Sequence, residues 1–222
     1  MKSYYLKNAN KFGWGTDHSI PEYKINELLP LVTGNKILDI GCGPGFFVNT
    51  LSNMGFDATG VDFTPKFISF ARKNFKGKFL VGDASKLTFD NQSFDTVFIK
   101  SVLEHVDNDI KVLKEALRVG KKVVIVVPQL TPLALKKRGL IFSHYQDQSH
   151  LRYYTPKSIN ELVAAAKATL VDIQTSEPLP NKSLVFDLLN GFGFFKRIAI
   201  KILFLLFSPK KYYLELIAII KP

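Results

Sequence analysis

Short apolar runs alternate along this chain with segments in which apolar residues recur every three or four positions. Runs of the first kind predict buried strands, and segments of the second kind predict amphipathic helices. Strands are expected at 37–40, 58–62, 79–84, 94–100, 123–127, 170–175 and 213–220. Helices are expected to begin near residues 19, 46, 64, 107 and 155. This alternation predicts an α/β fold in which helices cover both faces of a parallel sheet.

A glycine-rich turn follows the first apolar run. Residues 36–48 read Lys-Ile-Leu-Asp-Ile-Gly-Cys-Gly-Pro-Gly-Phe-Phe-Val, with glycine at alternate positions 41, 43 and 45. A strand that leads through a glycine turn into a helix is how α/β proteins hold a nucleotide. Glycine suits such a turn because it adopts positive φ and lets a ligand approach the backbone.

Acidic residues stand in or at the ends of three predicted strands. Asp39 lies in the first strand, Asp62 ends the second, and Asp83 lies near the end of the third. Asp62 follows the glycine turn at about the 20-residue spacing of an acid that binds a ribose hydroxyl. We therefore expect these carboxylates to gather at one edge of the sheet.

Taken together and in order, these motifs resemble those of class I S-adenosylmethionine-dependent methyltransferases. The motifs are residues 38–45, 60–62, 82–84 and 94–97, and residues 101–106 resemble the small-molecule branch that includes ubiquinone methyltransferases. The resemblance covers roughly residues 30–170. It implies a Rossmann-like, seven-stranded, mostly parallel sheet whose last strand is antiparallel and inserted beside strand six. It also implies that S-adenosylmethionine is the cofactor.

The resemblance further implies which residues bind the methionine part of the cofactor. The backbone at Gly41, Cys42 and Gly43 would lie beside the methionine portion of the cofactor. Asp39 would help to order the glycine turn and the ammonium group of the methionine portion. The single cysteine is expected to serve by its small size and not through thiol chemistry.

Other residues are implied for the nucleoside and the sulfonium. Asp62 would accept hydrogen bonds from both ribose hydroxyls, and Phe63 would pack on adenine. Asp83 would accept from the adenine amine. Ala84 would lie alongside the adenine, and Lys100 and Ser101 would lie near the sulfonium.

If the group that accepts the methyl is a hydroxyl, a general base is needed to remove its proton. The candidates are His105, His144, His150 and Asp147. Histidine suits this role because its ordinary pKa is near neutral pH. His150 is the preferred catalytic residue, because it precedes Arg152-Tyr153-Tyr154-Thr155, and related enzymes place substrate-side residues there; His105 is the second.

A metal is not predicted. The pair Glu104-His105 resembles part of a motif in quinone O-methyltransferases that holds a divalent ion. Those enzymes carry a further acid where this chain has Ser101, and we therefore expect none.

The chain is predicted to be one domain, 1–222, with three accessory segments. Residues 1–29 would form an N-terminal helical cover, and 129–154 a loop on the substrate side. Residues 181–211 would form a hydrophobic and basic helical insertion between strands six and seven.

The insertion leaves two interpretations open. Residues 192–207 are almost wholly apolar, but Lys196, Arg197 and Lys201 interrupt them, so the segment is too short and too charged to span a bilayer. One interpretation is a buried helix or a dimer contact. The other is that 192–211 rest on an anionic membrane surface or open to a lipid-like substrate.

Composition adds limits on compartment and partners. The formal net charge is +11, which permits an anionic partner or reflects lysine as the preferred surface residue. One cysteine and no early apolar run favour a cytoplasmic protein, peripheral at the membrane if the lipid interpretation holds. The sequence indicates no oligomeric state.

The function predicted is methyl transfer by in-line displacement to a small-molecule or lipid-like acceptor, with the acceptor atom left open. An RNA methyltransferase and a non-catalytic, membrane-associated cofactor-binding module are the alternatives. A nicotinamide dehydrogenase fits less well, because its GxGxxG motif would place glycine where Phe46 stands. DNA is disfavoured as a substrate, because 100–103 lack the Asn/Asp-Pro-Pro-aromatic motif of amino-methylating enzymes.

Overall fold

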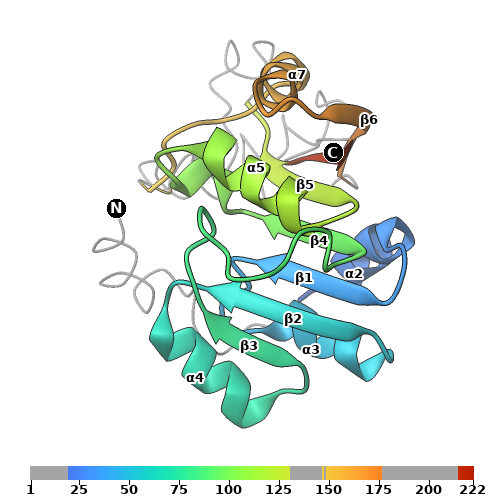
Figure 1. Cartoon of the computed structure of the whole chain (residues 1–222), viewed down its shortest axis with the longest axis vertical. Coiled ribbons are helices and arrows are strands. Elements are labelled where there is room, and N and C mark those ends of the chain that lie inside the picture. The colour runs from blue at the N-terminus through green and yellow to red at the C-terminus, as the bar shows by residue number, and fades with distance from the viewer. Residues whose placement is uncertain (1–19, 131–146, 148, 177–214) are drawn as a thin grey trace, which may run out of the picture.

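A seven-stranded sheet forms the centre of the computed structural model, which describes residues 20–130, 147, 149–176 and 215–222 (Figure 1). The strands lie in the order β3-β2-β1-β4-β5-β7-β6. Their bounds are β1 Lys36–Ile40, β2 Asp57–Asp62, β3 Lys78–Val81, β4 Thr96–Lys100, β5 Val123–Pro128, β6 Thr169–Thr175 and β7 Glu215–Lys221.

The pairing confirms the predicted topology. Strands β1 to β5 pair in parallel with one another, and β7 pairs antiparallel with both β5 and β6. The last strand is therefore inserted beside strand six, as the resemblance implied. Because the chain reverses its strand order after β3, the carboxyl ends of β1 and β4 meet at the switch point where open α/β sheets bind ligands.

Helices cover both faces of the sheet and enclose two apolar cores. Helices α2, α3 and α4 pack on one face, and α5, α7 and η2 pack on the other. Their bounds are α2 Glu22–Leu28, η1 Leu29–Leu31, α3 Phe46–Asn53, α4 Pro65–Asn74, η2 Leu103–His105, α5 Asp109–Val119 and α7 Pro156–Ala165. Strand residues alternate between the cores; Leu38 joins one and Ile37 the other.

Two local predictions need correction. Strand β3 ends at Val81, so Asp83 lies in a turn beyond the strand, bridged to Lys86. Helix α5 begins at Asp109 and not at Asp107, because the Asn108 side chain accepts from the Lys111 N–H and caps the helix there.

Parts of all three accessory segments lie outside the described residues. These parts are 1–19, 131–146 with 148, and 177–214, which includes the whole insertion 181–211. In the part of the chain that the structure describes, no helix is long and apolar enough to cross a membrane.

Alanine in place of Gly41 is expected to destabilise the fold by ~2–4 kcal/mol. Gly41 has φ +73°, and a Cβ there would overlap Cγ2 of Val102. Chemical denaturation measures the loss. The double variant Gly41→Ala/Val102→Ala removes the overlap and should recover part of it. An unchanged unfolding free energy in the single variant would contradict this packing.

Candidate functional site

The glycine turn is fastened to the end of strand β2. The N–H groups of Gly41 and Cys42 both donate to the Val61 carbonyl, at 2.7 and 3.1 Å. Among the described residues, no atom would lie within 4 Å of a Cβ added at Gly43, which has φ +53°, whereas Gly45 is packed against Phe79. The described part of the chain therefore leaves the backbone at Gly43 uncovered, and a ligand could lie against it there.

Asp62 joins the turn to the start of helix α4. One carboxylate oxygen accepts from the Gly43 N–H at 2.9 Å, and the other accepts from the Thr64 N–H at 2.8 Å. Asp62 is buried, and burial raises its pKa while these two backbone hydrogen bonds lower it. Each oxygen keeps a second lone pair with which it can accept from a ligand.

The buried Asp39 of β1 forms an ion pair with the partly exposed Lys100 of β4. The Lys100 Nζ lies 2.5 Å from Asp39 Oδ1 and 4.2 Å from the centroid of the Phe47 ring. Burial raises the pKa of Asp39, and the lysine opposes that shift. Within the described residues, the second oxygen, Oδ2, has no hydrogen-bond partner. An acceptor of this kind fits a positively charged or N–H donor group of a ligand.

The other predicted cofactor residues lie around the same strand ends. Asp83 is exposed, and its side chain accepts from the Ser85 N–H at 2.9 Å. Phe63 is half-buried just after β2, and Ala84 is half-buried in the turn after β3. Ser101, directly after β4, is exposed and adopts φ +51°. The sheet therefore brings these residues to the end that carries the glycine turn.

Cys42 is held inside the turn by close packing. A Cβ on Gly60 would lie 2.7 Å from the Cys42 Sγ, so the two residues fit only because Gly60 has no side chain. Burial raises the pKa of the thiol well above its ordinary value, with the negative charges of Asp39 and Asp62 adding to the shift. A neutral, buried thiol agrees with the structural role expected for this residue.

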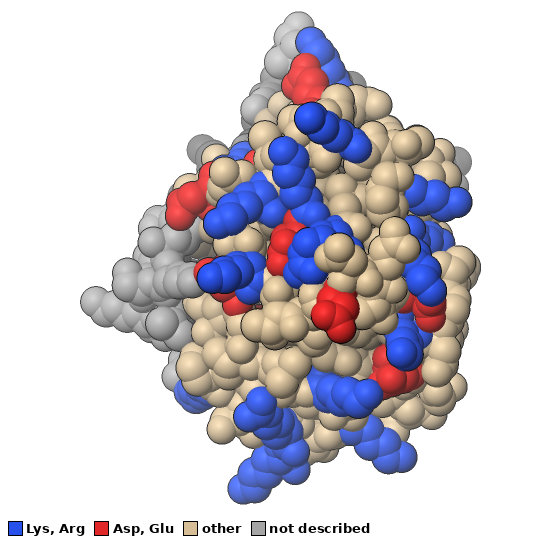
Figure 2. All heavy atoms as spheres, in the orientation of Figure 1, with Lys and Arg blue, Asp and Glu red and all other residues tan. Residues whose placement is uncertain are grey.

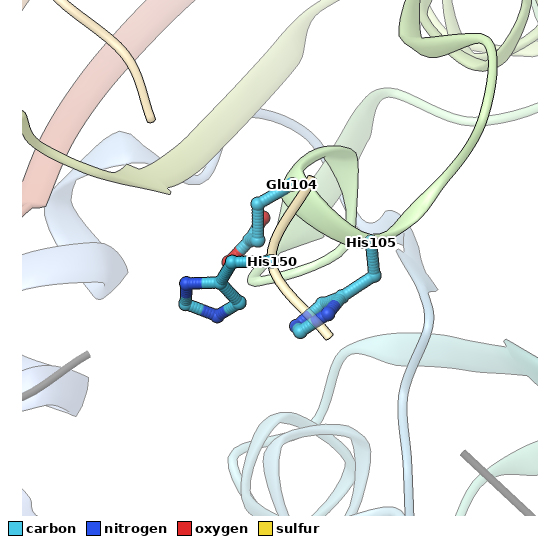
Figure 3. Close-up of side chains that lie close together, drawn as sticks. All are labelled: Glu104, His105 and His150. Carbon is cyan, nitrogen blue, oxygen red and sulfur yellow. The ribbon is translucent and has the colours of Figure 1, made fainter. Parts of the chain in front are cut away.

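A second cluster contains Glu104, His105 and His150 (Figure 3). One ligand atom from each lies within 4.8 Å of the others. The rings of His105 and His150 meet edge to face, with centroids 4.7 Å apart. Both predicted catalytic histidines therefore lie together, although 45 positions separate them along the chain; His144 lies outside the described residues.

Burial is the main cause of the pKa shifts in this cluster. It lowers the pKa of His105 to about 4 and raises that of Glu104 to about 8. It also lowers the pKa of His150, against the charge of Asp147. Near neutral pH the histidines are thus neutral and Glu104 is mostly protonated. The three side chains offer donors that could hold a divalent ion, and the prediction of no metal stays a prediction.

Arg152 holds the two halves of the cluster together, a role that the sequence did not predict. Its Nη1 donates to the carbonyls of Leu103 and Val106, at 2.8 and 2.7 Å, and its Nη2 donates to that of Asp107. The Leu151 N–H donates to the Glu104 carbonyl at 2.8 Å. The segment around His150 is therefore tied by backbone contacts to the turn that carries His105.

Charged side chains do not gather into a single basic patch on the face shown in Figure 2. Lysine and arginine are spread over this face, with Asp and Glu between them. Ion pairs such as Lys78–Asp57 and Lys121–Asp95 join residues of opposite sign at the surface. Asp95 also accepts from the N–H groups of Asn35 and Lys36.

Glutamine in place of Glu104 is expected to stabilise the protein increasingly as pH rises. The folded-state pKa of Glu104 lies above the unfolded value, so wild-type stability falls as pH increases from the unfolded pKa towards about 8. Between about pH 5 and pH 9, the advantage of glutamine should grow by on the order of 3 kcal/mol.

Thermal unfolding of wild type and variant at both pH values measures this difference. Glu161→Gln is the matched control, since the Glu161 side chain is 65% exposed. A destabilised Glu104→Gln protein at the higher pH would contradict the burial of a mostly neutral carboxyl group.

Comparison with known proteins agrees with the motifs. Residues 38–127 match the family model described as a methyltransferase domain. A demethylmenaquinone methyltransferase of Thermotoga maritima is 31% identical over 127 residues, which are 55% of this chain and 56% of the relative. A ubiquinone biosynthesis O-methyltransferase of Cereibacter sphaeroides is 26% identical over 202 residues, 84% of this chain and 78% of the relative. This chain spans about half the length of the first curated relatives that it matches.

Solved structures share the fold. An S-adenosylmethionine-dependent methyltransferase from Archaeoglobus fulgidus superposes with a TM-score of 0.65 at 21% identity, covering 90% of this chain and 91% of that one. Magnesium protoporphyrin IX methyltransferase from Synechocystis, with bound S-adenosylhomocysteine, has a TM-score of 0.62 at 14% identity and full coverage of both chains. The match of residues 38–127 to the methyltransferase-domain model agrees with the resemblance drawn from the motifs, and the solved structures share the predicted Rossmann-like fold.

Proposed function

We propose that this chain is an S-adenosylmethionine-dependent methyltransferase that acts on a small-molecule or lipid-like acceptor. The observation that supports this most is the turn at 41–45, which no other described residue covers at Gly43 and which the buried Asp62 fastens at the carboxyl ends of the parallel strands. The match of residues 38–127 to the methyltransferase domain supports the same class of reaction. Relatives named for menaquinone and ubiquinone biosynthesis suggest a quinone-like acceptor.

The residues at the strand ends suit each part of such a cofactor. The lone pairs remaining on Asp62 suit ribose hydroxyls, and the backbone at Gly43 suits close contact. Asp39 Oδ2, which has no partner among the described residues, suits the ammonium group. Asp83 and Phe63 are proposed to meet the adenine. Lys100 neutralises part of the charge of Asp39, which limits the cost of keeping that carboxylate buried.

Bound S-adenosylmethionine supplies an electrophilic methyl carbon on a sulfonium. The chain must then hold the acceptor in line with that carbon and exclude water, since positioning accounts for much of the rate gain in such a transfer. The carboxyl ends of β4 and β5 lead into the segments that carry the histidine cluster. The described part of the 129–154 loop packs beside that cluster, which supports its proposed place on the substrate side.

The membrane interpretation of 192–211 remains a separate proposal. This segment lies outside the described residues, so it rests on the sequence pattern of apolar residues interrupted by cations. Sedimentation of the intact protein with anionic vesicles tests it.

Alanine in place of Gly43 is expected to weaken S-adenosylhomocysteine binding at least about 10-fold, because a Cβ would occupy space that the ligand needs. The fold should tolerate the change at a cost of about 1–2 kcal/mol for alanine at positive φ, since an added Cβ meets no described atom within 4 Å. Gly55→Ala is the matched control: Gly55 also has positive φ and no described atom within 4 Å of an added Cβ, but it lies at the other end of α3. Isothermal titration calorimetry measures all three proteins.

Two results would contradict the proposed function. One is equal affinity of the Gly43→Ala and Gly55→Ala proteins for S-adenosylhomocysteine. The other is tighter binding of NAD than of S-adenosylhomocysteine by the wild-type protein, which would favour a dehydrogenase.

A further inference from the structure

We propose that Asp147 and Ser149 are positioning residues that fix His105 in one tautomer, with Nε2 as the nitrogen that accepts a proton from a hydroxyl-bearing acceptor. This inference rests on the proposed function and deepens it, because it assigns the base and the class of acceptor. It departs from the sequence prediction, which preferred His150.

A chain of hydrogen bonds leads from Asp147 to His105. The Ser149 Oγ lies 2.5 Å from Asp147 Oδ1 and 2.9 Å from His105 Nδ1. The Ser149 hydroxyl donates its one hydrogen to the Asp147 carboxylate oxygen. The hydroxyl oxygen must then accept from the imidazole. His105 Nδ1 therefore carries the hydrogen.

A second contact supports the same assignment. The backbone carbonyl of Ser149 lies 3.3 Å from the same Nδ1. A carbonyl oxygen can only accept, so this contact also requires hydrogen on Nδ1. In a neutral imidazole that is protonated at Nδ1, the lone pair belongs to Nε2, and this nitrogen becomes the basic one.

The hydrogen-bonded series Asp147–Ser149–His105, which we call the relay, is held in a fixed position. Ser149 is only 3% exposed, and its N–H also donates to Asp147 Oδ1 at 2.8 Å. Arg152 binds the carbonyls on both sides of His105, at Leu103 and Val106. The tautomer is thus set by groups whose positions are fixed by backbone contacts.

Burial and the neighbouring groups keep the His105 imidazole neutral, which is the form that can accept a proton. Burial and the neighbouring His150 lower the pKa of His105 to about 4, while Asp147 and the Ser149 carbonyl oppose that shift. Glu104, the remaining titratable group in the cluster, is mostly protonated near neutral pH. When an imidazolium forms at His105, the carboxylate of Asp147 stabilises it through Ser149.

The proton balance of the step is then complete. The acceptor oxygen forms a bond to the methyl carbon, and the carbon–sulfur bond breaks with its electron pair passing to sulfur. The hydroxyl proton moves to His105 Nε2. The products are the methyl ether, the neutral thioether and an imidazolium, which releases its proton to solvent after turnover.

Long-range ¹H–¹⁵N spectra of the full chain, labelled at histidine, test the tautomer directly. Wild type should show His105 protonated at Nδ1 near neutral pH, and Ser149→Ala should shift it towards Nε2–H. Ser69→Ala, at an exposed position of α4, should leave it unchanged. Nε2–H in the wild type, or no change in Ser149→Ala, would overturn the proposal.

Methyl transfer to catechol, hydroquinone and their isoprenylated forms tests the role in turnover. Ser149→Ala should lower kcat about 10-fold or more with little change in KM, since the relay acts on proton transfer and not on binding. Unchanged kcat overturns the role of the relay. So does activity abolished by EDTA and restored by Mg²⁺ or Zn²⁺, because the imidazole would then serve a metal.

Calorimetry with S-adenosylhomocysteine separates this inference from the proposed function. A wild-type protein that does not bind it refutes the methyltransferase assignment, whatever the tautomer. A protein that binds it but methylates none of the phenolic probes refutes the hydroxyl acceptor alone.

Discussion

The buried carboxylate of Asp62 is the contact on which the site depends. It accepts from the Gly43 N–H on one side and from the Thr64 N–H on the other, so it joins the glycine turn to the start of α4. The Val61 carbonyl fastens the same turn through the N–H groups of Gly41 and Cys42. These contacts fix the backbone of the turn before any ligand arrives, which reduces the ordering that a ligand must otherwise impose.

Much of the fold was predictable because it depends on local patterns. Apolar runs of strand length and helical spacings located all seven strands and the helices that cover them. The errors in the prediction were confined to the ends of helices and strands, where a single hydrogen bond can decide the boundary. The Asn108 cap moved the start of α5, and the strand before Asp83 ended earlier than its apolar pattern suggested. The antiparallel direction of β7 and its position beside β6 were expected from the family resemblance and not from the pattern of apolar residues.

The site was predictable only in part. Strand ends carrying Asp39 and Asp62 meet because a parallel sheet aligns them, so their grouping follows from topology. The histidine cluster depends instead on Arg152, whose bonds to three carbonyls tie together segments about 45 residues apart. No spacing rule relates a guanidinium to carbonyls so distant in sequence. The contact of Ser149 with His105 could not be predicted for the same reason, since a loop serine acquires this role only when folding places it between Asp147 and His105.

We propose that the end of the sheet which carries the glycine turn binds an adenosyl cofactor. Amide ¹H–¹⁵N spectra recorded during titration with S-adenosylhomocysteine test this binding. We expect saturable shifts of the Gly43, Thr64 and Asp83 amides, which NAD at the same concentration does not reproduce. Shifts confined to other parts of the chain, with these three amides unmoved at saturation, would contradict it.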